Sequence, residues 1–259
     1  MKPFKAHIFI GWIIAAVLVM TGCGGGSSGS GGGGGNGTGG GTGPVASSIF
    51  ETFALDDFGG GFSAAVAVNN AASAEFVGFS ADDTPAVKGV LWTFENGVPS
   101  APAELPPLAG NNFSAAYGIN NSGAAVGESG TTVVVDNTPV ADFNSVAVIW
   151  EPGALEPSPL SATGFFENGF STAYAINSFA EIVGEAARTA QGDGVAVYWA
   201  NPGANPVILA DLDANAGNSF AYFISDSGII AGESRNTNGR MQAVVWVPDA
   251  GGTYGAPLA

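Results

Sequence analysis

The chain has 259 residues, of which 46% are hydrophobic and only 11% are charged. Its 22 acidic residues outnumber six Lys and Arg, which gives a formal net charge of −16 and a surface that repels the phosphate backbone of nucleic acids. The only His and the only Cys, His7 and Cys23, stand near the N-terminus, so the rest of the chain holds no Ser-His-Asp triad, Cys–His pair, His-ligated metal or intrachain disulfide.

Residues 1–22 have the layout of a bacterial export signal. Lys2 and Lys5 precede an apolar run, Ile8 to Met20, which is shorter than the roughly 20 residues that a membrane-spanning helix needs. The run ends in Met-Thr-Gly-Cys, which resembles the lipobox of bacterial lipoproteins, with Met20 in place of the usual Leu. That resemblance implies cleavage before Cys23 and its lipidation. An ordinary secretory signal or a retained anchor is the alternative.

Residues 23–44 follow as the lipidated Cys and a linker of almost pure Gly, Ser, Thr and Asn. Such a composition cannot bury apolar surface, so we expect a flexible tether with a root-mean-square span of about 25 Å. In lipoproteins, Asp directly after the Cys retains the protein at the inner membrane, and Gly24 stands there instead. We therefore expect a lipid-anchored protein of the outer membrane, with its domain in the periplasm or at the cell surface. Without its signal the chain carries four basic residues against all 22 acidic ones, a net charge of −18.

Residues 45–259 are organised by a repeat. The stretch FSAAYGINNSGAAVGES, which begins at Phe113, recurs in altered form from Phe62, Phe170 and Ser219. Each copy leads to a short β-like run ending in Trp, which places four units near residues 62–92, 113–150, 170–199 and 219–246. Asn-Asn-Ser-Gly predicts a hairpin turn in which Asn120 and Gly123 are able to take positive φ, and the Gly of Val-Gly-Glu, inside a strand, predicts a bulge or the close approach of a neighbouring sheet. The four Trp residues are suited to packing between sheets, with ligand stacking as the alternative.

A repeat near 50 residues with about four short strands is typical of a β-propeller blade. The combination S-x-A-x-x-I-N, V-G-E-S and A-V-x-W also resembles the HAF repeat of bacterial extracellular proteins. Here Ala-Val-Ile, Ala-Val-Tyr and Ala-Val-Val replace the family's His-Ala-Phe. The resemblance implies an exported, propeller-like repeat domain and carries over no catalytic residue. We therefore expect an all-β, β-propeller-like array of four repeats of about 50 residues.

One strand is left over in this count. A strand-like stretch precedes each unit, beginning with residues 45–55, and residues 252–259 look like a fifth copy. A closed ring of four blades does not need five such strands. An incomplete or open propeller, in a chain that is a fragment of a longer one, is therefore the alternative to a simple ring.

Two groups of residues carry the potential for chemistry. Asp211, Asp213 and Asn215 alternate as in many calcium loops, although the Gly comes one position late for an EF-hand, so calcium is a weak candidate and a plain acidic loop the alternative. Glu128, Glu185 and Glu233 follow the repeated Val-Gly or Ala-Gly and are candidate ligand-facing carboxylates, with Phe79 in their place in the first unit. If the units ring an axis, the three carboxylates could bind a cation or act as acid and base on a glycoside. If they are solvated groups at strand ends, they would do neither.

These observations favour a binding or structural module of the cell envelope, anchored to a membrane, over an enzyme. A glycan or a protein is the expected ligand, and nucleic acid is not. No catalytic residue, firm metal site or cofactor is predicted. A carboxylate-dependent enzyme acting on carbohydrate is the alternative function.

Overall fold

The computed structural model describes residues 52–84, 86–135, 138–141, 145–154, 156–162, 170–188, 194–213 and 218–259. The predicted signal peptide, the linker and Cys23 lie outside these residues. Within them all regular structure is β-strand, and no helix is present, which confirms the all-β prediction. Accordingly, the described part of the chain offers no apolar helix of membrane-spanning length.

Each predicted repeat unit forms its own antiparallel sheet. The first sheet contains β1 (Gly59–Val68), β2 (Ala74–Asp82), β3 (Val87–Glu95), β4 (Val98–Pro99) and β5 (Ala103–Leu105). The second contains β6 (Phe113–Ile119), β7 (Ala125–Gly130), β10 (Val146–Trp150) and β11 (Ser158–Pro159). The third contains β12 (Ser171–Ile176), β13 (Ile182–Ala187), β14 (Gly194–Trp199) and β15 (Val207–Ile208). The fourth contains β16 (Ser219–Ile224), β17 (Ile230–Arg235) and β18 (Met241–Trp246).

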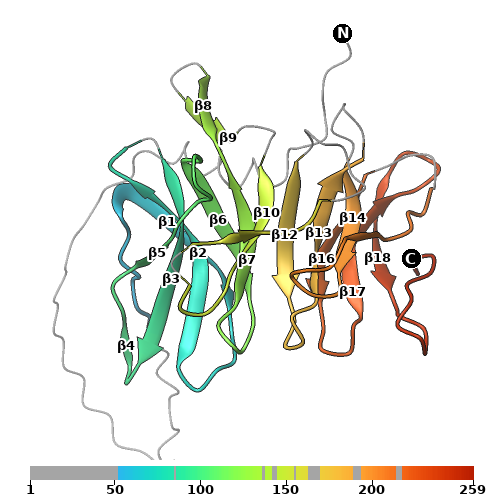
Figure 1. The fold of residues 1–259 in the computed structure, drawn as a ribbon, viewed down its shortest axis with the longest axis horizontal. Coiled ribbons are helices and arrows are strands. Elements are labelled where there is room, and N and C mark those ends of the chain that lie inside the picture. The colour runs from blue at the N-terminus through green and yellow to red at the C-terminus, as the bar shows by residue number, and fades with distance from the viewer. Residues whose placement is uncertain are drawn as a thin grey trace, which may run out of the picture.

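The second unit carries an additional hairpin in the loop before its Trp-ending strand. This loop is the longest of the four in the sequence, and it forms β8 (Thr132–Val135) and β9 (Thr138–Ala141), which pair only with each other. In Figure 1 the hairpin projects beyond the second sheet. The insertion therefore leaves the strand order of its sheet unchanged.

The sheets share one strand order, for which we use four names. The first strand (β1, β6, β12, β16) pairs with the middle strand (β2, β7, β13, β17), and the middle strand pairs with the Trp strand (β3, β10, β14, β18). The outer strand (β5, β11, β15) pairs with the Trp strand and comes from the segment that precedes the next unit. In the fourth sheet Leu258 takes this place by bridging to Val245.

This arrangement explains the leftover strand. The stretch before each unit completes the preceding sheet, so residues 252–259 serve the fourth sheet as earlier copies serve theirs. The predicted strand at residues 45–55 has no preceding Trp strand to pair with. Residues 45–51 lie outside the described residues, and Thr52–Leu55 is not a strand, so that prediction is wrong for the described part.

The repeated Gly of each middle strand stands opposite a bulge in the first strand, as predicted. In the second sheet the register shifts between Ala116 and Gly118, opposite Gly127. A Cβ on Gly127 would lie 1.9 Å from the carbonyl oxygen of Ala115, so only Gly allows the first strand to approach so closely. The residue between the shifted pairs is Tyr117, which becomes important below.

The hairpin turns agree with the prediction in part. Gly123 and Gly228 take positive φ, and in the third unit Ala180 does so with φ of 60°. Of the two residues able to take positive φ in the second unit, Gly123 does so and Asn120 does not. Its side-chain Oδ1 instead accepts hydrogen bonds from the backbone N–H groups of Ser122 and Ala124. Asn120 therefore closes the turn with its side chain rather than with an unusual backbone.

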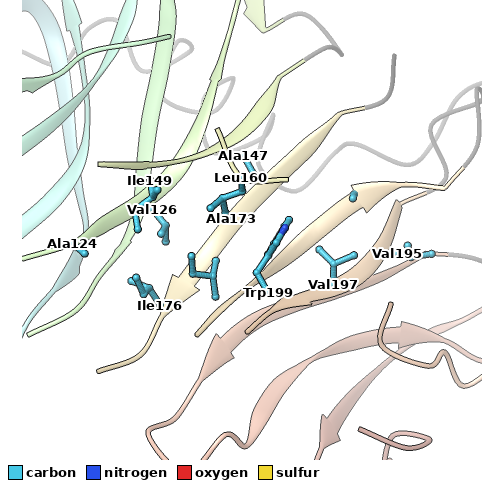
Figure 2. Close-up of a cluster of buried hydrophobic side chains, with 12 residues drawn as sticks. Ala124, Val126, Ala147, Ile149, Leu160, Ala173, Ile176, Val195, Val197 and Trp199 are labelled. Carbon is cyan, nitrogen blue, oxygen red and sulfur yellow. The ribbon is translucent and has the colours of Figure 1, made fainter. Parts of the chain in front are cut away.

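The four repeat Trp residues are buried, at 2% exposure or less, and Trp150, Trp199 and Trp246 pack in clusters with residues of the preceding sheet. Trp199 packs in a cluster with Val126 and Ile149 of the second sheet and Ala173 and Val197 of the third (Figure 2). Its indole N–H donates to the carbonyl of Ser161 at 2.9 Å. The indole N–H of each of the other three Trp residues likewise donates to a backbone carbonyl in the segment that precedes its own unit. No exposed ring face is left for a ligand to stack on.

Two sets of hydrogen bonds join consecutive sheets at the repeat period. In the first set, which we call the Ser staple, a first-strand Ser accepts from a backbone N–H of the preceding Trp strand. The pairs are Gly89 to Ser114, Ala147 to Ser171 and Ala196 to Ser219, at 2.8–2.9 Å. In the second set, the Asn ladder, an amide donates to a carbonyl in the next turn. The pairs are Asn69 to Asn120, Asn120 to Asn177 and Asn177 to Ser225, at 3.1–3.2 Å.

The sheets follow one another along the long axis of the molecule. In Figure 1 the first sheet lies at one end and β18 of the fourth sheet at the other. Each first strand contacts the sheet before it: β6 contacts β1, β2 and β3, and β16 contacts β12, β13 and β14. The four repeats therefore form an array in which the repeated residues hold each sheet against the next.

Candidate functional site

The three predicted carboxylates occupy the same position in successive sheets. Glu128, Glu185 and Glu233 lie on the middle strands, each opposite an Ala of the Trp strand in their own sheet. Glu128 and Glu185 are buried, at 7% and 5% exposure, and Glu233 is half-buried. The alternative of solvated strand ends therefore does not describe Glu128 and Glu185.

Each carboxylate accepts a hydrogen bond from the Tyr hydroxyl at the bulge of its own first strand. The distances are 2.7 Å for Tyr117 to Glu128, 2.5 Å for Tyr174 to Glu185 and 2.8 Å for Tyr222 to Glu233. The Tyr rings lie in a continuous row, with centroids 5.9 Å apart between Tyr117 and Tyr174 and 5.4 Å apart between Tyr174 and Tyr222. We call these three pairs the Tyr–Glu row.

The first sheet replaces both members of the pair at once. Val66 stands at the bulge and Phe79 at the carboxylate position, and Phe79 is buried at 1% exposure. A buried Glu without its Tyr, or a buried Tyr without its Glu, would lose the hydrogen bond and keep the cost of desolvation. Replacing both partners by apolar side chains avoids that cost, so the pair behaves as one unit of the fold.

The two buried carboxylates differ in their second oxygen. Oε2 of Glu128 accepts a hydrogen bond from the hydroxyl of Thr172 in the next sheet, at 3.1 Å. The position of Thr172 is occupied by Phe220 one sheet later, immediately after the staple Ser of each strand. Oε2 of Glu185 accordingly has no hydrogen-bond partner among the described residues.

Burial raises the pKa of Glu185 to about 8. The hydrogen bond from Tyr174 lowers this pKa, whereas the charge of Glu128 raises it further. Burial also raises the pKa of the Tyr117 and Tyr174 hydroxyls well above their ordinary value, and the neighbouring carboxylates raise it further. Glu185 is therefore protonated at neutral pH and the two Tyr side chains stay neutral.

A carboxyl group with a pKa near 8 has the acidity of a general acid, but such a group must also reach its substrate. Glu185 is buried: its Oε1 accepts the hydrogen bond from Tyr174, and a Cβ on Gly194 of the neighbouring strand would lie 2.6 Å from its Oε2. In Glu128 both oxygens are already engaged. The geometry is that of a buried polar contact between sheets, and ligand binding by these carboxylates stays a prediction.

The calcium candidate is only partly within the described residues, since Asn215 lies outside them. The carboxylate of Asp211 accepts a hydrogen bond from the staple Ser219 and lies 3.7 Å from the guanidinium of Arg188. Burial raises the pKa of Asp211, while Ser219 and Arg188 lower it and Asp213 raises it. Among the described residues no three His, Cys, Asp or Glu side chains are grouped so as to hold a metal ion.

Sequence reasoning found the three Glu residues but missed the Tyr and Thr partners. A signal for the Tyr residues exists within the chain: units two to four carry both Tyr and Glu, whereas the first unit carries Val66 and Phe79. This joint exchange indicates contact between the two positions. Thr172 leaves no such signal, because only one interface uses it.

Comparison with known proteins does not place the chain in a family. No family model matches the sequence, and no curated protein matches it significantly.

Proposed function

We propose that this chain is a lipid-anchored, extracytoplasmic repeat protein of the bacterial cell envelope that acts as a binding or structural module. Its four sheets are an arc of a β-propeller, built from repeats of the HAF type. Cys23 carries the lipid and residues 24–44 form the tether. The expected partners are a membrane, reached through the anchor, and a glycan or protein ligand.

The observation that carries this proposal is how the repeated residues are used. The staple Ser, the ladder Asn, the bulge Gly and the Trp all hold one sheet against the next, or one strand against its neighbour. Even Glu128, which the fold did not obviously require, has both oxygens bonded to neighbouring strands. Recurrence of the motif is thus explained by architecture, which favours a module over an enzyme.

A carboxylate-dependent enzyme on carbohydrate is the competing function. The raised pKa of Glu185 is the observation in its favour, because a general acid has this property. Glycan-array binding and glycan hydrolysis should be measured on the soluble chain from Val45. We expect binding without turnover. Any background hydrolysis should be the same in Glu128→Gln and Glu185→Gln as in the control Glu151→Gln, in which the replaced carboxylate is exposed. Turnover that disappears in Glu128→Gln and Glu185→Gln but persists in Glu151→Gln would support the enzyme and contradict the binding module.

The anchor has a separate test. In cells fed a labelled fatty acid, the chain should take up label and Cys23→Ala should not. Globomycin, which blocks lipoprotein signal cleavage, should cause the unprocessed chain to accumulate. A Cys23→Ala protein that is still labelled would contradict the anchor while leaving the binding function untouched.

A further inference from the structure

The described residues offer few side chains that a one-electron oxidant can attack. They contain no Cys or His, and Met241 is their only Met, so the remaining oxidisable side chains are those of Tyr and Trp. Loss of one electron turns either aromatic ring into a strong acid. The ring that has a base within reach of its proton is therefore the ring that stays oxidised.

The four repeat Trp residues have no such base. Each indole N–H donates to a backbone carbonyl oxygen, which is too weak a base to accept a proton. All four side chains are buried, so an oxidised indole would keep a positive charge away from water. Oxidation of Trp is therefore unfavourable in this fold, and an electron lost from Trp is replaced by one from an easier donor.

The Tyr–Glu row supplies the base that the Trp residues lack. Each Tyr hydroxyl of the row donates to a carboxylate at 2.5–2.8 Å, so the electron and the proton can leave Tyr together. Glu128 and Glu233 carry a negative charge, which acts on Glu185 and on Tyr222 respectively. Transfer of the proton to Glu128 or Glu233 neutralises that charge, and burial favours the neutral acid. Oxidation of the pair therefore leaves two neutral groups.

The members of the row differ in exposure, which gives the row an entrance and an interior. Tyr222 is half-buried, whereas Tyr117 and Tyr174 are buried, at 9% and 8% exposure. With ring centroids 5.4–5.9 Å apart, an electron can pass from Tyr117 to Tyr222 through the ring of Tyr174. Glu185, whose pKa burial raises to about 8, already holds a proton at neutral pH and cannot accept another from Tyr174. Tyr174 is therefore a conductor, and Tyr117 is the buried member that can stay oxidised.

We propose that the Tyr–Glu row is a redox site that reacts with small one-electron oxidants and ends as a neutral radical on Tyr117. The oxidant removes one electron from Tyr222, and the phenolic proton moves to Oε1 of Glu233. Tyr117 then reduces Tyr222 through the row, while its own proton moves to Oε1 of Glu128. Glu233 returns its proton to Tyr222. In the balance the oxidant gains one electron, Tyr117 loses one electron and one proton, and Glu128 gains that proton.

Flash oxidation of the purified full chain tests the proposal. Light and persulfate convert the tris(bipyridine) complex of ruthenium(II) into that of ruthenium(III), a one-electron oxidant whose positive charge attracts it to the acidic protein. We expect electron paramagnetic resonance to detect a neutral tyrosyl radical as the main product. Because Tyr117 is buried, this radical should be long-lived and should form little dityrosine between molecules.

Three variants test the roles within the row. Tyr117→Phe should lose the long-lived signal, because the radical then stays on half-buried Tyr222. Glu128→Gln should lose it too, because Gln can accept the hydrogen bond from Tyr117 but not its proton. This loss separates a redox role from a structural one, and it tests the site even where Tyr117→Phe does not fold. Tyr222→Phe should lower the yield of the radical without shortening its lifetime. Circular dichroism checks the fold of each variant.

Two Tyr residues outside the row provide matched controls. Tyr198 donates to the carboxylate of Glu181 at 2.6 Å, and Tyr254 donates to the carbonyl of Gly228 at 2.7 Å. Their rings contact each other, with centroids 5.0 Å apart. Tyr198→Phe and Tyr254→Phe should therefore leave the long-lived signal unchanged.

The proposal is overturned by any of three results. The first is a Trp radical as the main product of the flash. The second is a long-lived tyrosyl signal that persists in Tyr117→Phe or in Glu128→Gln. The third is a loss of this signal in Tyr198→Phe as large as the loss in Tyr117→Phe, which would place the radical outside the row.

Discussion

Phe220 occupies the strand position that Thr172 occupies one sheet earlier, and Glu185 therefore lacks the second hydrogen-bond donor that Glu128 has. The two interfaces share the Tyr–Glu pair and differ in one side chain. At the earlier interface Thr172 bonds Oε2 of Glu128 across the sheets. At the later one the carboxyl group is buried without that bond, and it holds a proton at neutral pH. The Thr-to-Phe difference thus removes the second donor from Glu185, a carboxyl group whose pKa burial raises to about 8.

The stability of the protein should fall as the pH rises from about 5 to 8 because of Glu185. Its pKa is about 8 in the folded state against an ordinary value of 4.5, so between these values the folded state binds more protons than the unfolded state. The stabilisation is complete below the lower value and is lost as the pH rises through the higher one, by on the order of a few kcal/mol. Glu185→Gln should remove this dependence and be more stable than the wild type at pH 8. Urea unfolding at about pH 5 and at pH 8 measures the free energy of unfolding of both proteins.

Glu151→Gln is the matched control for this experiment, because the Glu151 side chain is exposed. It should follow the wild-type slope. If Glu185→Gln and Glu151→Gln show the same dependence on pH, Glu185 is ionised in the folded state and the assignment is wrong.

Thr172→Val should destabilise the protein by about 1–3 kcal/mol, since it removes the hydroxyl donor to a buried carboxylate and keeps the shape of the side chain. Thr253→Val, at an exposed loop position, should change the free energy of unfolding by less than about 0.5 kcal/mol. The measurement is chemical denaturation at pH 7. Phe220→Thr is the reverse change, and by giving Oε2 of Glu185 a donor it should reduce the pH dependence described above. An unchanged free energy of unfolding in Thr172→Val would show that Oε2 of Glu128 finds a replacement donor.

The sequence predicted the fold to the level of its units because each unit repeats local signals. Gly127 and its equivalents mark the bulge, Gly123 marks the turn, and Trp150 marks the end of the third strand. These signals depend on neighbours within one sheet, which lie close in sequence or recur at a fixed spacing.

The remaining features depend on contacts between sheets, whose partners are far apart in the chain. Glu128 and Thr172 are 44 residues apart, and nothing in either residue's own unit indicates that they meet. The strand predicted before the first unit failed for the same reason: its counterparts are strands only because a preceding Trp strand pairs with them. The missing second donor of Glu185 could not be foreseen either, because Phe220 stands in another unit, at the position from which Thr172 donates to Glu128.

Ala180→Gly should stabilise the protein by about 0.5–1 kcal/mol. Ala180 has φ of 60° at a turn position where two other units carry Gly, and left-handed backbone costs an L-residue roughly 1–2 kcal/mol. Part of that gain is offset, because Gly makes the unfolded chain more flexible. Gly123→Ala is the reciprocal variant and should be destabilised, since φ there is 85° and the added Cβ would lie 3.2 Å from the carboxylate of Glu75. Thermal unfolding measures both. Destabilisation of Ala180→Gly would mean that its methyl packing against the core outweighs the backbone strain.

Ser171→Ala should cost about 1–3 kcal/mol, because it leaves the buried N–H of Ala147 without an acceptor between the second and third sheets. Ser178→Ala removes another Ser hydroxyl that bonds across sheets, to Asp226, but at an exposed position where water replaces the partner. Its cost should stay below about 0.5 kcal/mol. Native-state hydrogen exchange gives a direct readout, since the Ala147 amide should lose protection in Ser171→Ala and keep it in Ser178→Ala. Equal costs in the two variants would mean that the staple does not hold the sheets together, and the repeated Ser would then need another explanation.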